Sequence, residues 1–228
     1  MIETIRKNGI ILGAFALVTT SVLALTYNLT FERIELAKER QLLDVLNQVI
    51  DPSIQNNELH VDCITIEPEN LLGNETQRVF RARLNGEPSA LILETTATNG
   101  YSGPIKMVVA VDKSASTVLG VRVVEHKETP GLGDKIDIRV SNWIKSFNNV
   151  KYSDERADRW QVKKDGGQFD QFTGATITPR AVVRAVANTT KFAQENLSNL
   201  FLTPSNCSPG PQKGELDVNV SSSQELGQ

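Results

Sequence analysis

The chain has 228 residues, a formal net charge of −3 and 39% hydrophobic residues. This length and composition suit one globular domain with appendages and exclude a wholly disordered polymer. The mildly acidic balance argues against nucleic-acid binding, which needs a basic surface. Two cysteines and two histidines form no visible set of metal ligands, so no metal site is expected.

A membrane-spanning helix is predicted over residues 9–29. This stretch of 21 residues carries no charge, and a helix of that length crosses a hydrocarbon core of about 30 Å. Tyr27 lies near its end, where an aromatic ring suits the membrane interface. A cleaved signal peptide is the alternative, but its apolar region is usually only about 7–15 residues long. We therefore expect a membrane anchor, preceded by a short segment over residues 1–8.

The charges that flank this span favour neither orientation. Arg6 and Lys7 precede it, and three cations follow it at Arg33, Lys38 and Arg40. With the terminal amine included, the two sides are about even, and long domains cross membranes largely regardless of charge.

Residues 30–52 are predicted to form an amphipathic helix. Their apolar residues recur at steps of three and four, at Phe31, Ile34, Leu42, Val45, Leu46 and Val49. The pair Asp51-Pro52 predicts the end of this helix, because proline disfavours helical geometry in the residue before it. The heptads are too few for a coiled coil, so we expect a helix on the surface of the soluble domain.

The body of the chain, residues 53–202, is predicted to be an α+β domain with an antiparallel sheet and flanking helices. Alternating or apolar patterns predict strands over residues 77–84, 90–95, 105–112 and 118–125. Asn85-Gly86 is typical of a hairpin turn between the first two strands. Apolar spacing predicts a short helix over residues 141–147 and a longer one over residues 180–201.

Residues 203–228 are predicted to be a disordered tail, because they are rich in Pro, Gly and Ser and contain few large apolar residues. Cys207 lies in this tail. Cys207 could form a disulfide with Cys63 or remain a free, solvated thiol, and the sequence favours neither.

The stretch from Asp165 to Pro179 is the first candidate site. Thr178-Pro179 predicts a helix start, with a hydroxyl at the N-cap and proline at the first helical position. The positive end of that helix would point at residues 173–176, where Gly174 and Ala175 allow close approach. This arrangement favours a bound anion such as a phosphate. A plain capped turn is the alternative.

A second candidate is the loop from His126 to Asp134, after the last predicted strand. Its glycines on either side of Leu132 allow a tight turn with exposed backbone amides. Such a loop could take a flat ligand or an anion, and an ordinary strand-to-helix connection is the alternative.

These two stretches resemble a known family. Thr173-Gly-Ala-Thr176, preceded by Asp170, resembles the recognition motif of a flavin transferase, which attaches flavin mononucleotide (FMN) to a threonine through a phosphoester. Together with Glu128-Thr-Pro-Gly-Leu-Gly133, the run from Trp160 and the single span, the motif makes the chain resemble the RnfG family of Rnf electron-transport complexes. The resemblance extends from the span to about Phe201.

The resemblance implies a set of site residues. Thr176 would carry the FMN, and Asp170 would be recognised by the flavin transferase. The remaining cofactor-binding residues would be Glu128, Thr129, Gly131, Leu132, Thr173, Gly174 and Ala175. No side chain is expected to be catalytic, because the cofactor would carry the electrons.

The resemblance also implies location and partners. The FMN core, at about residues 90–200, would lie on the periplasmic face of the inner membrane, with residues 1–8 in the cytoplasm. The partners would be the membrane, the A, B, C, D and E subunits of the complex and, during maturation, the transferase. The complex would pass electrons between ferredoxin-type carriers and nicotinamide nucleotide and couple this transfer to ion movement.

Three other functions remain as alternatives. One is the C subunit of a sodium-translocating quinone reductase, which shares the flavin threonine. The others are a membrane scaffold without a cofactor and a periplasmic module that binds a small anion. The uncharged span over residues 9–29 has no intramembrane charge, so an ion pathway would belong to partner subunits.

Overall fold

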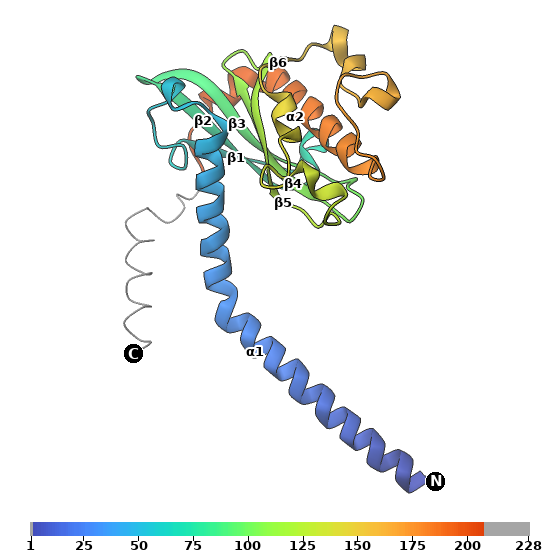
Figure 1. The fold of residues 1–228 in the computed structure, drawn as a ribbon. Coiled ribbons are helices and arrows are strands. Elements are labelled where there is room, and N and C mark those ends of the chain that lie inside the picture. Colours follow the sequence, from blue (N-terminus) through green and yellow to red (C-terminus); the bar gives the residue numbers. More distant parts are fainter. Residues whose placement is uncertain (1, 208–228) are drawn as a thin grey trace. The chain divides into compact units, whose positions relative to one another are not determined.

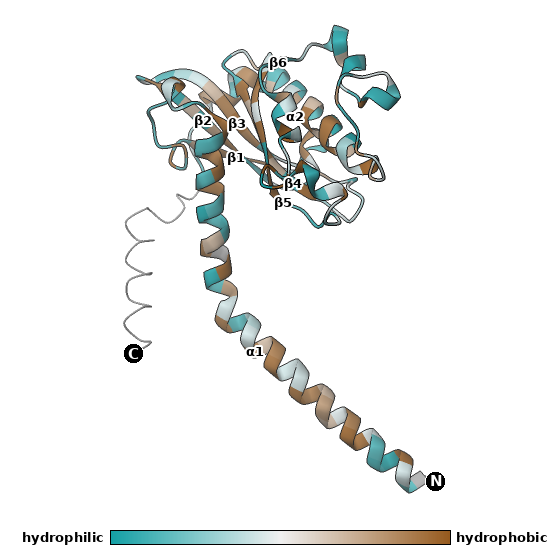
Figure 2. Ribbon diagram, viewed as in Figure 1, coloured by the Kyte–Doolittle hydropathy of each residue, from teal (hydrophilic) through white to brown (hydrophobic). Residues whose placement is uncertain are grey.

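The computed structural model describes residues 2–207, which divide into two compact units at residues 41 and 42 (Figure 1). Helix α1 (Ile2–Val49) begins in the first unit and ends in the second. Among the described residues it is the one helix long and apolar enough to cross a membrane, with a mean hydropathy of 2.1 in its most apolar window. Figure 2 shows this apolar part as a largely brown stretch of α1.

The second unit is built on a six-stranded antiparallel sheet in the order β1-β2-β3-β4-β5-β6. The strands are β1 (Cys63–Ile66), β2 (Gln77–Leu84), β3 (Glu87–Ala97), β4 (Ile105–Asp112), β5 (Thr117–Glu125) and β6 (Val150–Lys151). Asn85 and Gly86 join β2 to β3 with positive φ angles of 54° and 87°, as the predicted two-residue hairpin requires. The predicted antiparallel α+β fold is therefore confirmed.

Two helical segments cover the two faces of this sheet. Helix α2 (Ile177–Leu202) packs on one face and buries Val182, Val186 and Phe192 against strand residues such as Leu91 and Val109. The last two turns of α1 pack on the other face, where Leu42, Leu46 and Val49 are buried against Ile92 and Val108. Alternate residues of β3 and β4 thus serve two separate apolar layers, as the period of a strand requires.

Gly120 allows the end of α1 to approach β5 closely. A Cβ atom at this position would lie 2.7 Å from the carbonyl oxygen of Val49. Beyond Val49, Asp51 accepts a hydrogen bond of 2.8 Å from the amide of Ser53 and caps a short 3₁₀ turn that begins at Pro52. The helix therefore ends where Asp51-Pro52 predicts.

Several element boundaries differ from the sequence-based expectation. Strands β2 and β4 have the predicted bounds, whereas β3 is longer at both ends. The short strands β1 and β6 escape prediction, because four and two residues are too few to show a period. The predicted helix over residues 141–147 is a 3₁₀ helix over Trp143–Phe147.

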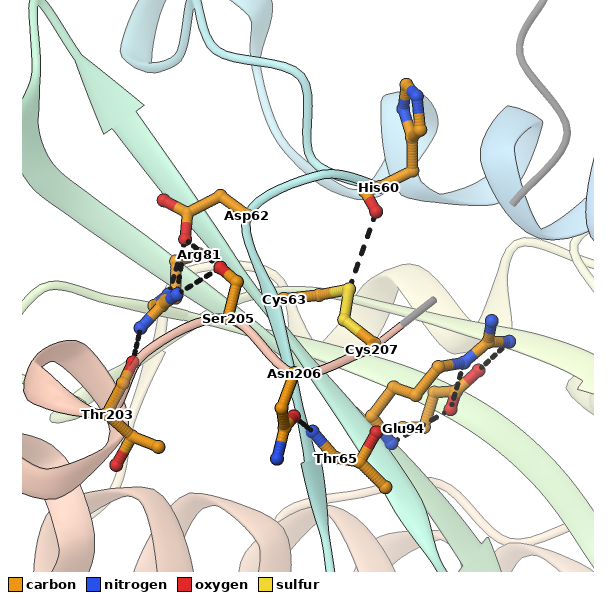
Figure 3. Close-up of a disulfide and its surroundings, with 11 residues drawn as sticks. His60, Asp62, Cys63, Thr65, Arg81, Glu94, Thr203, Ser205, Asn206 and Cys207 are labelled. Atoms are coloured by element: carbon orange, nitrogen blue, oxygen red, sulfur yellow. Dashed lines mark hydrogen bonds and ion pairs between the residues drawn. A yellow bond between two sulfur atoms is a disulfide. The ribbon is translucent and has the colours of Figure 1, made fainter. Parts of the chain in front are cut away.

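The prediction of a disordered tail from residue 203 is wrong for its first five residues. Buried Arg81 of β2 donates hydrogen bonds to the carbonyl of Thr203 and to the hydroxyl of Ser205. Cys207 forms a disulfide with Cys63, whose Cα lies 5.8 Å away (Figure 3). The rest of the predicted tail, residues 208–228, lies outside the described residues.

Candidate functional site

Three loops of the second unit meet at a cavity of about 240 Å³. The first connects β3 to β4, the second follows β5, and the third precedes α2. The residues that line the cavity are Tyr101, Glu128, Thr129, Leu132, Gly133, Gly174, Ala175, Thr176, Ile177 and Thr178. The fold therefore brings the two sequence motifs together, although about 40 residues separate them.

The start of α2 differs from the prediction in a way that matters for the site. The helix begins at Ile177, with Thr176 as the N-cap residue, so the prediction of Thr178 as N-cap is wrong. Thr178 is fully buried, and its hydroxyl donates a 2.5 Å hydrogen bond to the carboxylate of Glu128. Pro179 still lies in the first turn of α2. Proline fits there because a backbone N–H in the first turn would have no partner within the helix.

Thr176 is the residue whose hydroxyl remains available at this helix start. Thr176 occupies the N-cap position of α2, but its side chain makes no capping hydrogen bond. The residue is half-buried and lines the cavity. The first N–H groups of α2 lie beside it without helical partners, which gives the position a preference for negative charge.

The turn before Thr176 lies against the loop after β5. The amide of Ala175 donates a 3.2 Å hydrogen bond to the carbonyl of Phe172, which closes a tight turn. Gly174 has a φ of 82°, and a Cβ atom there would lie 3.6 Å from the Leu132 side chain. The two motifs thus lie close together at Gly174 and Leu132, which both line the cavity.

The loop after β5 is held in shape by its own backbone. The amides of Leu132 and Gly133 donate hydrogen bonds of 3.1 and 3.2 Å to the carbonyl of Thr129. At Gly133 a Cβ atom would lie 2.6 Å from a carboxylate oxygen of Glu128. This loop therefore needs a glycine at position 133 for packing.

The rim of the cavity is apolar and exposed. Tyr101, Leu132 and Ile177 have exposed fractions of 68%, 42% and 46%, and all three line the cavity. Large apolar side chains that gather around one cavity usually mark a binding site. They suit a flat, partly apolar ring, with a phosphate at the start of α2. The described residues therefore fit FMN.

Sequence reasoning misses Tyr101 and Ile177 as cavity residues. No sequence motif marks Tyr101, and only the folded loop between β3 and β4 shows that it lines the site. Ile177 is expected before the helix, whereas it is the first helical residue.

Three of the expected site residues do not line the cavity. Gly131 and Thr173 are exposed beside it. Asp170 is exposed at the surface, where its carboxylate pairs with Lys163 at 2.5 Å and its carbonyl accepts a 2.8 Å hydrogen bond from the indole of Trp143.

Two ion pairs support the segments that carry the site. Arg180, in the first turn of α2, donates hydrogen bonds of 2.5 and 2.6 Å to Asp165 and lowers the pKa of that carboxyl. The hydrogen bond from Arg139 likewise lowers the pKa of Asp137, which lies 3.8 Å from the ring of His126. Both carboxylates therefore stay charged to lower pH than usual.

Comparisons with known proteins agree with this geometry. Residues 100–191 match the family model described as the FMN-binding domain, and residues 1–49 match that of the RnfG N-terminal region. The fold and the site thus define a flavin-binding domain behind an N-terminal apolar helix.

The relatives identify the family within this class. The G subunit of the ion-translocating oxidoreductase complex of Pseudoalteromonas atlantica is 50% identical over 208 residues, covering 91% of this chain and 96% of that protein. The corresponding protein of Vibrio cholerae is 48% identical, covering 91% of this chain and 99% of that protein. The chain belongs to this RnfG family of the ion-translocating oxidoreductase complex. Among solved structures, NqrC of Shewanella oneidensis is 25% identical, with a TM-score of 0.47, covering 61% of this chain and 70% of that one.

Proposed function

We propose that this protein carries electrons on an FMN joined to Thr176 by a phosphoester. The proposal rests on which threonine hydroxyls near the start of α2 are already hydrogen-bonded. The hydroxyl of Thr178 is buried and bonded to Glu128, whereas Thr176 lines the cavity and its hydroxyl makes no capping bond. Thr173 is exposed and lies outside the cavity lining. Thr176 is therefore the residue best placed for attachment.

The residues around Thr176 would each hold a different part of the cofactor. The first N–H groups of α2 would bind the phosphate, because they have no helical partners and face the helix start. Tyr101, Leu132 and Ile177 would contact the ring and exclude water from it. FMN, when bound, supplies reversible one-electron and two-electron redox chemistry. The chain's part is to fix the position and surroundings of the ring.

We place the soluble domain on the periplasmic side of the inner membrane, with residues 1–8 in the cytoplasm. The Cys63–Cys207 disulfide supports this orientation, because the bacterial cytoplasm keeps thiols reduced and the periplasm is oxidising. The flanking charges favour neither side, so the disulfide is the stronger indication.

The partners that we propose are the A, B, C, D and E subunits of the complex and, during maturation, a flavin transferase. The complex would pass electrons between ferredoxin-type carriers and nicotinamide nucleotide. Asp170 is accessible for recognition by the transferase, with its side chain 69% exposed. The uncharged stretch over residues 9–29 offers no ion pathway, so ion movement would take place in other subunits.

The intact mass of the denatured full-length chain, produced in a bacterium with the flavin transferase, tests the attachment. We expect a mass increment of one FMN that maps to the peptide containing Thr176. Thr176→Ala should lose the increment and keep the fold. Thr117→Ala, at the start of β5 and outside both motifs and the cavity lining, is the matched control that should keep the increment. An unmodified wild-type chain, made beside a control substrate that the transferase modifies, would instead support a scaffold without a cofactor.

A further inference from the structure

We infer that Glu128 is a positioning residue rather than a ligand of the flavin. It joins the loop between β3 and β4, here called the Tyr101 loop, to the start of α2. The inference rests on the proposed function only for the identity of the cofactor. The connection that Glu128 makes is a property of the polypeptide alone.

Both carboxylate oxygens of Glu128 are bonded to protein groups. Oε1 accepts a 3.0 Å hydrogen bond from the amide of Ser102, and Oε2 accepts a 2.5 Å hydrogen bond from the hydroxyl of Thr178. The backbone amide of Glu128 donates a 3.1 Å hydrogen bond to Nδ1 of His126. The residue is thus fixed at both its backbone and its side chain.

Packing encloses the same carboxylate. Glu128 is 5% exposed. A Cβ atom on Gly100 would lie 3.0 Å from Oε1, and one on Gly133 would lie 2.6 Å from Oε2. The backbones of these two glycines therefore lie close to the carboxylate, and both of its oxygens are already bonded to protein groups. A buried carboxylate without those bonds would be strongly disfavoured.

The two bonded partners are close in sequence to residues on different walls of the cavity. Ser102 follows Tyr101 directly, and Thr178 lies two residues after Thr176. One carboxylate therefore fixes an aromatic residue of the rim relative to the attachment threonine. Loss of this connection would free the Tyr101 loop while leaving Thr176 at the helix start.

The two possible roles of Glu128 give different results for its substitutions. Glutamine can keep the connection, because its amide oxygen accepts from Ser102 and its amide nitrogen donates to the oxygen of Thr178. Alanine removes both bonds. A positioning role therefore predicts rescue by Glu128→Gln, whereas a role that needs the negative charge at the flavin predicts that glutamine fails like alanine.

Hydrogen exchange of the full-length chain in detergent tests the connection without flavin. All variants carry Thr176→Ala, so no covalent FMN is present. We expect Glu128→Ala to speed exchange of the Ser102 amide about tenfold, as loss of one charge-assisted hydrogen bond would do. Glu128→Gln should remain within about threefold of the parent. The control is Glu125→Ala, an exposed carboxylate at the end of β5, which should change nothing there.

A second readout uses the flavin in chains that retain Thr176. The visible circular dichroism of bound FMN should change in Glu128→Ala and be preserved in Glu128→Gln. If Glu128→Ala does not fold, Thr178→Val takes its place in both experiments, because it removes only one of the two hydrogen bonds. The inference is overturned if Ser102 stays protected in Glu128→Ala, or if Glu128→Gln alters the flavin signal as much as Glu128→Ala. Absence of flavin from the wild type would defeat the proposed function and leave the exchange result standing.

Discussion

Arg180 donates two hydrogen bonds, of 2.5 and 2.6 Å, to the carboxylate of Asp165. This pair joins the segment after Trp160 to the first turn of α2, one turn beyond Thr176. This ion pair therefore stabilises the end of α2 at which we place the phosphate. It acts through a different segment from the residues to which Glu128 is hydrogen-bonded.

The first prediction concerns recognition during maturation. Asp170→Ala should reduce the fraction of chain that carries FMN, because it removes an exposed carboxylate of the proposed recognition motif. The modified fraction is read from intact mass after a fixed time with the transferase. Lys163→Ala breaks the same ion pair and keeps Asp170, so it should retain modification. Equal losses in both variants would assign the effect to the ion pair instead.

The second prediction compares two glycines of the loop after β5. Gly133→Ala should destabilise the domain by about 2 kcal/mol, because its Cβ would overlap the Glu128 carboxylate. Gly131→Ala has open space around its Cβ, and its cost of about 1 kcal/mol comes only from the positive φ of 78°. Denaturant unfolding of the full-length chain measures both. A larger loss at Gly131 would contradict the packing argument.

The third prediction concerns the disulfide. The Cys63–Cys207 bond links residues 144 apart, and a bond that closes a long loop stabilises by about 2–5 kcal/mol. Cys207→Ser should lower the melting temperature under oxidising conditions. A reductant should lower the melting temperature of the wild type to that of Cys207→Ser. It should leave the melting temperature of the variant unchanged. A wild type that melts at the same temperature with and without reductant would show that the bond contributes nothing.

The fourth prediction concerns pH. Burial raises the pKa of Asp62, but the hydrogen bond and charge of Arg83 and the charge of Arg81 outweigh it, so the pKa lies below its usual value. The stability from this carboxylate is present above its unfolded pKa of about 3.9 and is lost as the pH falls through the lower folded pKa. Asp62→Asn should therefore cost about 2 kcal/mol at pH 7.

Unfolding at pH 7, 5 and 3 checks the sign of this dependence. The difference between Asp62→Asn and the wild type should be similar at pH 7 and 5 and smaller at pH 3. The exposed carboxylate Glu87 gives a control, Glu87→Gln, which should show little difference throughout. A difference for Asp62→Asn that grows in acid would exclude the proposed linkage.

Sequence patterns could predict the fold where the information is local. The alternation of residues 77–84 and the Asn85-Gly86 turn specify β2 and its hairpin directly. Strand β1 escapes prediction, because its four residues pair only once β2 is present. The ordered segment Thr203–Cys207 escapes it for a similar reason, since its partners Arg81 and Cys63 are more than 100 residues away.

The candidate site shows the same limit. The motif around Thr176 and the loop containing Leu132 could be found from the sequence. The start of α2 could not, because Thr178 looks like a capping residue until Glu128, 50 residues earlier, takes its hydroxyl. Tyr101 joins the site only through the folding of three loops, which no local pattern encodes.

The segment at Asn206 bears on the solubility of the domain. The backbone amide of Asn206 donates a hydrogen bond to the carbonyl of Cys63 in β1. The side-chain Oδ1 of Asn206 accepts a hydrogen bond from the amide of Thr65 (Figure 3). An uncovered outer strand can template edge-to-edge pairing between molecules. The segment Thr203–Cys207 thus covers part of this edge, and we expect reduction of the Cys63–Cys207 disulfide to uncover it and to favour aggregation.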